Sequence, residues 1–81
     1  MEGDGGMTRY ANLGGDSGVV GYDAGPGFIV VYFHDGSAYR YTDRSAGQAH
    51  IATMHRLAQA GQGLNAYINT HVKHGYESKL R

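Results

Sequence analysis

The apolar residues in the first half of the chain follow the pattern of short β-strands. Residues 18–23 (GVVGYD) form an apolar run that ends at the turn signal AGPG, residues 24–27. Residues 28–33 (FIVVYF) are rich in the β-branched and aromatic side chains that strands favour. The polar segment HDG, residues 34–36, separates this run from SAYRYT at residues 37–42. The pattern predicts three strands joined by short turns, which form an antiparallel meander.

The length of the second turn decides which side chains share a face of the sheet, because a slip of one residue turns a strand over. Tyr39 and Tyr41 share one face, and Arg40 points to the other face in either register. A two-residue turn places the tyrosines with one set of side chains from the preceding strand: Phe28, Val30 and Tyr32. A three-residue turn, with Gly36 left-handed, places them with the other set: Ile29, Val31 and Phe33.

The apolar period becomes helical in the second half of the chain. Residues 45–61 place one face at helical spacing, made of Ile51, Met54, Leu57 and Ala58. Ser45 followed by Gln48 fits a capping box, and Gly61 fits the left-handed residue that ends a helix. Residues 63–75 repeat the pattern and end at Gly75, with an apolar face made of Leu64, Tyr67, Ile68, His71 and Val72.

These elements predict an α+β fold, a three-stranded antiparallel β-meander followed by two α-helices packed on the sheet. We expect residues 1–12 to form a flexible N-terminal tail, because the glycine-rich start offers little apolar surface to bury. Residues 13–81 are expected to form a single domain. A domain of this size has room for one modest core and one functional surface.

The formal net charge of zero hides an uneven distribution along the chain. Residues 1–35 carry five acidic side chains against one arginine, a net charge of −4, and residues 36–81 carry six basic against two acidic side chains, a net charge of +4. Free nucleic-acid binders usually have a net positive field, because phosphate contacts supply much of their affinity. A neutral domain meets that need only if folding gathers its basic half on one face. It could equally use each pole on a different part of a protein partner.

Short motifs associated with enzymes do not carry a site in this chain. GDSG at residues 15–18 resembles the nucleophile loop of trypsin-like proteases, but that chain order needs a histidine before the serine, and the first histidine is His34. Neither GxxxxGK[ST] nor a GxGxxG that leads from a strand into a helix occurs. We therefore expect no enzymatic activity and no cofactor.

The histidines and the apolar runs limit the remaining classes. A metal site at His71 and His74 would need Glu77 or Asp43 to converge with them, so we expect no bound metal. There is no cysteine to form a disulfide or to supply a thiolate ligand. The longest apolar run has six residues, which is far too short to span a membrane, and the opening MEGDGG has no apolar stretch typical of a secretory signal. We expect a cytoplasmic protein with no membrane partner.

The triplet Tyr39-Arg40-Tyr41 has two interpretations. Exposed tyrosine rings can stack on bases while an arginine contacts phosphate, which would make this strand a nucleic-acid surface. Alternating aromatic residues are also good strand formers, and both rings can pack beneath the helices. We favour the second interpretation, in which Arg40 alone faces outward.

Three segments, in order, resemble the KTSC domain, a family named after a C-terminal domain of some lysyl-tRNA synthetases and marked by a central Y-x-Y. They are VGYD at residues 20–23, FHDGSAYRY at residues 33–41 and INTHVKHGY at residues 68–76, and the resemblance covers roughly residues 13–76. The chain departs from the family at Gly14-Gly15, where two serines are frequent, and at Arg44-Ser45, where Val-Pro is frequent. The family pattern implies the three-residue turn.

The resemblance implies a non-catalytic module, for which RNA binding has been suggested and of which stand-alone copies occur in bacteria and phages. We expect a small binding module that docks on a protein or nucleoprotein partner. A phage-type inhibitor of a host nucleic-acid-targeting complex, such as a CRISPR-Cas effector (an anti-CRISPR), is one such module. The alternative is an RNA- or DNA-binding module that uses the basic C-terminal half and the tyrosines. We expect a monomer or weak dimer, with these partner-binding residues: Tyr39, Arg40, Tyr41, Arg44, Arg56 and Lys73.

Overall fold

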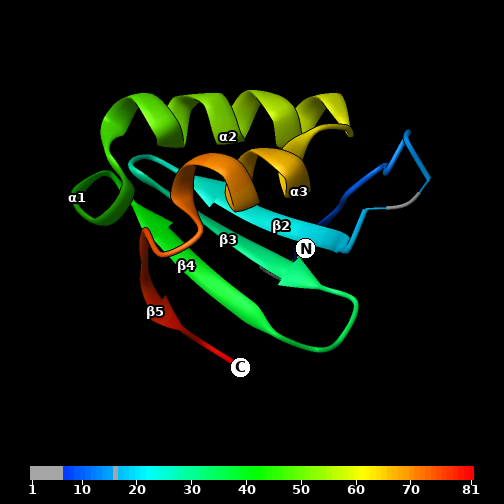
Figure 1. Cartoon of the computed structure of the whole chain (residues 1–81), viewed down its shortest axis with the longest axis horizontal. Helices are drawn as coiled ribbons and strands as arrows, with labels where there is room; N and C mark the ends of the chain where they lie inside the picture. Colours follow the sequence, from blue (N-terminus) through cyan, green and yellow to red (C-terminus); the bar gives the residue numbers. More distant parts are fainter. Residues whose placement is uncertain (1–6, 16) are drawn as a thin grey trace, which may run out of the picture.

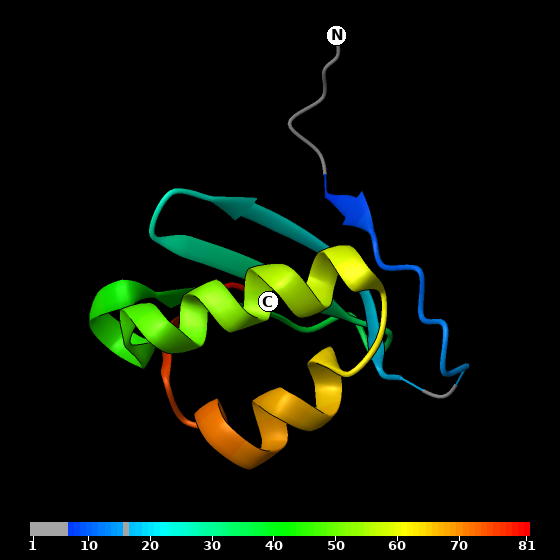
Figure 2. The same ribbon diagram turned by 90° about the horizontal axis from the view of Figure 1, so that it is seen from above.

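The protein folds as an antiparallel sheet with helices on one of its faces (Figures 1 and 2). The computed structural model describes residues 7–15 and 17–81. Within these residues the strands are β1 (Thr8–Arg9), β2 (Val19–Gly25), β3 (Phe28–Phe33), β4 (Ala38–Thr42) and β5 (Tyr76–Lys79). They pair in chain order, β1-β2-β3-β4-β5. The helical segments are α1 (Asp43–Ala46), α2 (Gln48–Ala60), α3 (Leu64–Tyr67) and η1 (Ile68–Val72), a π-helical segment that continues α3.

The expectation of a three-stranded meander with two helices is wrong, although the fold is α+β. The sheet of the described residues has five strands, because β1 and β5 pair with the outer edges of β2 and β4. β1 has two residues, and β5 reads Tyr-Glu-Ser-Lys beyond Gly75. Neither segment shows the sustained alternation by which a strand is recognised in a sequence.

The β3–β4 hairpin has the three-residue turn that the resemblance implied. Phe33 N–H donates to the carbonyl of Ser37 at 2.8 Å, so residues 34–36 form the loop. Gly36 adopts φ of +92°, a conformation that favours glycine. The register pairs Val31 with Tyr39, and Ile29 with Tyr41 in the same way, which confirms that these side chains share one face.

The helices begin and end at other residues than the pattern predicted. The capping box joins Thr42 and Ser45, whose side-chain oxygens each accept from the backbone N–H of the other residue, so the expected Ser45–Gln48 box is wrong. Gly47, with φ of +101°, separates α1 from α2, and the predicted single helix 45–61 is therefore two. Gly61 ends α2 with φ of +78°, as predicted.

The hydrophobic core lies between the sheet and the helices. Its sheet side includes Ile29, Val31 and Tyr41, which alternate with outward-pointing neighbours. Its helix side comes from one stripe of α2 and one stripe of α3–η1, made of Ile51, Met54, Ala58, Leu64, Ile68 and Val72. No helix among the described residues has the length and apolar content needed to cross a membrane.

Part of the expected tail belongs to the fold. Residues 1–6 lie outside the described residues, but Thr8 and Arg9 pair with β2. Tyr10 is 3% exposed in the core, and its hydroxyl accepts a hydrogen bond from Leu64 N–H at 3.2 Å. The folded unit therefore begins before residue 13, because the core uses a tyrosine that stands outside any recognisable apolar run.

Candidate docking surface

The face of the sheet that the helices leave uncovered carries paired rings and arginines. We call it the open face and define it by Phe28, Val30, Tyr32, Ala38, Arg40, Glu77 and Arg81. Phe28, Val30 and Tyr32 alternate along β3 with the core residues, so the strand itself aims them away from the helices. β4 places Arg40 beside Val30 in the register.

Arg40 is held in position by two neighbours. Its Nε donates to Glu77 Oε1 at 3.0 Å, and its guanidinium carbon lies 4.4 Å from the centre of the Phe28 ring. The side chains of Arg40 and Glu77 are 37% and 50% exposed, so this ion pair contributes little to stability. Its effect is to orient the guanidinium, whose terminal N–H groups make no hydrogen bond within the described residues.

A second ring–arginine pair extends the open face. The guanidinium carbon of Arg81 lies 5.4 Å from the centre of the Tyr32 ring. Val30, between Phe28 and Tyr32 along β3, is only 4% exposed although it lies outside the core cluster. The open face thus presents two partly exposed rings, Phe28 and Tyr32, each with an arginine above it, while Val30 and Ala38 between them are buried.

Three of the predicted partner-binding residues meet on the other side of β4. Tyr39, Tyr41 and Lys73 line a cavity of about 260 Å³, which we call the tyrosine cavity. Its remaining walls are Phe33, Ile68, Asn69, His74 and Tyr76. Tyr41 is 2% exposed and belongs to the core, so its ring is not available to stack on a base. The interpretation of the tyrosines as inward-facing is confirmed for Tyr41, and Tyr39 is partly buried against the core.

The environment of Tyr41 makes the stability of the fold depend on pH in the alkaline range. Burial, with a smaller repulsion from Tyr39 and Tyr76, raises the pKa of Tyr41 to about 12. The tyrosines of an unfolded chain ionise near pH 10. Between about pH 10 and 12 the unfolded state therefore binds fewer protons at this residue than the folded state, and stability falls as pH rises.

We expect the Tyr41→Phe variant to lose stability less steeply than the wild type over this range, because it has no hydroxyl at this position to ionise. Urea denaturation at steps between about pH 9 and 12 measures the slope. Tyr32→Phe, which removes a tyrosine hydroxyl from the open face, is measured in parallel as the matched substitution. Identical slopes for wild type and Tyr41→Phe would contradict the assignment.

The structure does not bring the remaining predicted residues to these two surfaces. Arg44 is exposed on α1, and Arg56 is exposed on α2. Neither lines the tyrosine cavity or takes part in the ion pair of the open face. The six predicted residues therefore do not form one platform, because Arg40 and the two tyrosines point to opposite faces of β4 and two arginines stand on separate helices.

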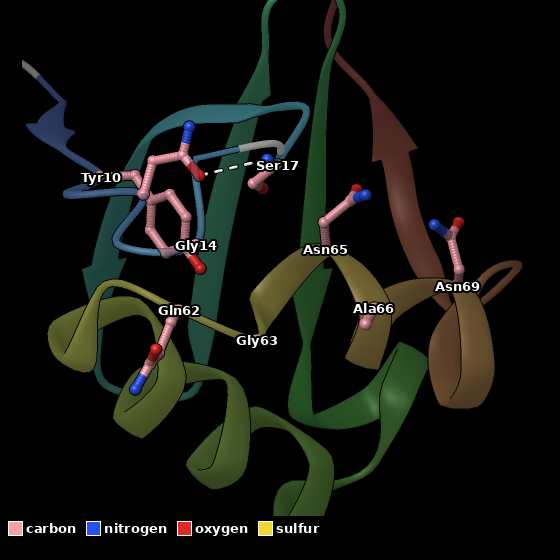
Figure 3. A pocket seen from close by; sticks show the side chains of 9 residues that line it. Tyr10, Gly14, Ser17, Gln62, Gly63, Asn65, Ala66 and Asn69 are labelled. Atoms are coloured by element: carbon pink, nitrogen blue, oxygen red, sulfur yellow. Dashed lines mark hydrogen bonds between the residues drawn. The ribbon is translucent and has the colours of Figure 1, made fainter.

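A second hollow, of about 440 Å³, lies between the loop after β1 and the helix α3–η1 (Figure 3). Figure 3 shows Tyr10 and Ser17 on the loop side and Asn65 and Asn69 on the helix side. The polar side chains that the structure describes there are amides and hydroxyls, without a carboxylate, an imidazole or a cation. They can donate and accept hydrogen bonds, but they supply no nucleophile with an adjacent base.

The histidines do not assemble a metal centre in the described part of the chain, where no group of three or more histidine, cysteine, aspartate or glutamate residues could hold an ion. His50 hydrogen-bonds through Nδ1 to the hydroxyl of Tyr67, and the ring of His71 lies 4.4 Å from that of Tyr67, centre to centre. His71 thus packs against the Tyr67 ring. Glu77, a candidate third ligand, is paired with Arg40 instead.

No protein-family model, curated protein or solved structure matches this chain. The resemblance to the KTSC domain therefore stays a prediction from its three segments. The proposals below rest instead on the geometry of the two faces of β4.

The predicted partner-binding residues include only Arg40 of the open face and three of the eight residues that line the tyrosine cavity. Phe28 and Tyr32 were visible as alternate residues of an apolar strand, but their exposure depends on the turn register. Glu77, Tyr76 and Arg81 belong to the unrecognised strand β5 and its end. The signal that could have found them was the compact aromatic and charged segment after Gly75.

Proposed function

We propose that this chain is a non-catalytic binding module that docks on a protein partner through its open face. The observation that supports the proposal is the position of Arg40, oriented by Glu77 and by the Phe28 ring before any partner arrives. Arginine and aromatic side chains dominate the binding energy of protein interfaces. Orienting such a side chain in advance reduces the entropy lost on binding.

The charges of the open face favour a protein over free nucleic acid. The central arginine is already paired with a carboxylate, so the face offers phosphate a weakened field. The terminal N–H groups of Arg40 remain suited to hydrogen-bond acceptors such as backbone carbonyls, and the Phe28 and Tyr32 rings to an apolar group. The partner that fits is a protein surface with a hydrogen-bond acceptor beside an apolar side chain.

The test captures partners from a nuclease-treated bacterial lysate on immobilised wild type, Arg40→Gln and Arg56→Gln, and then measures the affinity of the captured protein for each. Arg40→Gln should weaken binding by roughly tenfold or more, the loss of an interface hot spot. Arg56→Gln removes the same charge from an exposed position on α2 and should bind as the wild type does. Thermal melts should show both variants to be folded, because the Arg40 ion pair is exposed.

Two results would defeat the proposal. Capture that disappears with nuclease would favour the alternative, a nucleic-acid-binding module, whose affinity should fall steeply with added salt. Equal affinity of wild type and Arg40→Gln for the captured protein would remove the open face as the docking surface.

The narrower proposal is that the partner is a host nucleic-acid-targeting complex, such as a CRISPR-Cas effector, which the module would block. The small size, the zero net charge and a docking surface that needs no catalysis support it. Addition of the purified protein to assembled effector complexes, with target cleavage as the readout, tests this form. If cleavage of the target is unchanged at a saturating concentration of this protein, the effector complex tested is not its partner.

A further inference from the structure

The tyrosine cavity is lined by hydrogen-bond donors without an acidic side chain among its described walls. Three tyrosines, Tyr39, Tyr41 and Tyr76, line it together with Lys73 and His74. Phenols and amides can donate as well as accept, and an ammonium only donates. A site with this set of groups suits a ligand rich in acceptors.

The hydroxyl of Tyr41, a buried residue that lines the cavity, has no hydrogen-bond partner among the described residues. Tyr41 is 2% exposed, and it lines the cavity. The tyrosine hydroxyls that take part in hydrogen bonds between described residues belong to Tyr10 and Tyr67. A buried polar group without a partner costs stability, and a ligand or a water must satisfy it.

Basic side chains lie near the tyrosine cavity, and the carboxylate of the neighbouring Glu77 is engaged on the other face of the sheet. Lys79 Nζ lies 5.7 Å from the centre of the ring of Tyr39, a residue that lines the cavity. Glu77, the acidic residue next to Tyr76, is paired with Arg40 on the opposite face. Lys73 lines the cavity from the end of η1. Two cationic side chains, Lys73 and Lys79, therefore adjoin the cavity or one of its rings.

The rings give the cavity a rigid frame. The centres of Tyr39 and Tyr76 are 4.8 Å apart, and Phe33 meets Tyr39 edge to face with centres 5.9 Å apart. Tyr41 contacts Tyr76 in the same edge-to-face way. Aromatic side chains that hold one another in this manner keep their hydroxyls in place, which reduces the entropy lost when a ligand binds.

We propose that the tyrosine cavity is an oxyanion-binding site, which takes a phosphate or carboxylate group through the Tyr41 hydroxyl, the Lys73 ammonium and the Asn69 amide. The site lies on the other side of β4 from the open face, so it is independent of the docking surface. Its ligand chemistry is shared by a phosphorylated group and by an acidic group, and the two are separated by experiment.

The test is a titration of the isotope-labelled full chain, followed by two-dimensional NMR, with inorganic phosphate in one series and acetate in the other at constant ionic strength. Saturable shifts should appear at Asn69, Lys73 and Tyr76. Tyr41→Phe, which keeps the ring and removes the hydroxyl, should weaken binding by roughly tenfold, the effect of one hydrogen bond to a charged group. Lys73→Gln, at an exposed position, should weaken it to a similar extent.

Matched controls remove the same groups elsewhere. Tyr32→Phe takes a hydroxyl from the open face, and Arg56→Gln takes a charge from α2, so both should bind as the wild type does. Saturable binding of phosphate alone identifies a phosphoryl ligand, saturable binding of acetate alone identifies a carboxylate, and binding of both shows a site that accepts either group. Absence of saturation up to about 50 mM of either anion overturns the proposal. Unchanged affinity in both Tyr41→Phe and Lys73→Gln also overturns it.

Discussion

Replacement of Tyr10 by alanine is expected to lower the free energy of unfolding by about 3–5 kcal/mol, the cost of emptying a buried aromatic site. Tyr10 is 3% exposed and packs in the core although it precedes the first apolar run of the sequence. Its hydroxyl also accepts the N–H of Leu64, at the start of α3. The substitution therefore removes both core packing and a link between the N-terminal segment and the helix.

Urea denaturation of Tyr10→Ala and Tyr10→Phe separates these two contributions. Tyr10→Phe keeps the ring and leaves Leu64 N–H without its acceptor, so it should cost only about 1 kcal/mol. A loss below about 1 kcal/mol in Tyr10→Ala would show that residues 7–12 do not belong to the fold in solution, as the sequence pattern first indicated.

Gly61→Ala is expected to cost about 2–4 kcal/mol, for two reasons that add. Gly61 adopts φ of +78°, a left-handed conformation that costs about 1–2 kcal/mol for a residue with a Cβ. A Cβ there would also lie 2.6 Å from the Cβ of Ala11, so the segment after β1 would have to shift. This close approach holds the loop that borders the hollow of Figure 3 against the end of α2.

Gly36→Ala is the matched control, because Gly36 also has a positive φ, of +92°, but a Cβ there would meet nothing within 4 Å. It should cost only the backbone term, about 1–2 kcal/mol. Chemical denaturation of both variants measures the difference. Equal losses would show that the contact between Gly61 and Ala11 contributes nothing, and that left-handed strain alone explains both results.

The sequence predicted the elements whose pattern is long and regular. β3 matches its apolar run, Phe28–Phe33, residue for residue, and α2 follows the stripe of Ile51, Met54 and Ala58. The edge strands β1 and β5 were missed because a short strand with one partner needs no repeated apolar face. The start of the helical region was predicted wrongly because Ser45 forms its capping box with Thr42, three residues before it, and not with Gln48, three residues after it.

Less of the candidate site could be predicted than of the fold. Arg40 was correctly placed opposite the tyrosines, since that follows from alternation along a strand. Its two partners could not be predicted, because Glu77 lies 37 residues away in the chain and Phe28 takes the same face only in one register of the turn. Lys73 was included for its charge, whereas the structure assigns it to a cavity with two of the tyrosines.

The Tyr39-Arg40-Tyr41 triplet shows which features follow from the local sequence and which depend on the tertiary structure. The covalent geometry of a strand requires that the two rings and the guanidinium point in opposite directions, and this holds for any fold that keeps the strand. Which of the two faces the helices cover was decided by the turn at Gly36 and by packing against α2 and α3–η1. Pairing of β4 with β5 then supplied Glu77 to the arginine and Tyr76 to the rings. Contacts between residues so distant in the chain form only when the core closes, because they have no local pattern to specify them.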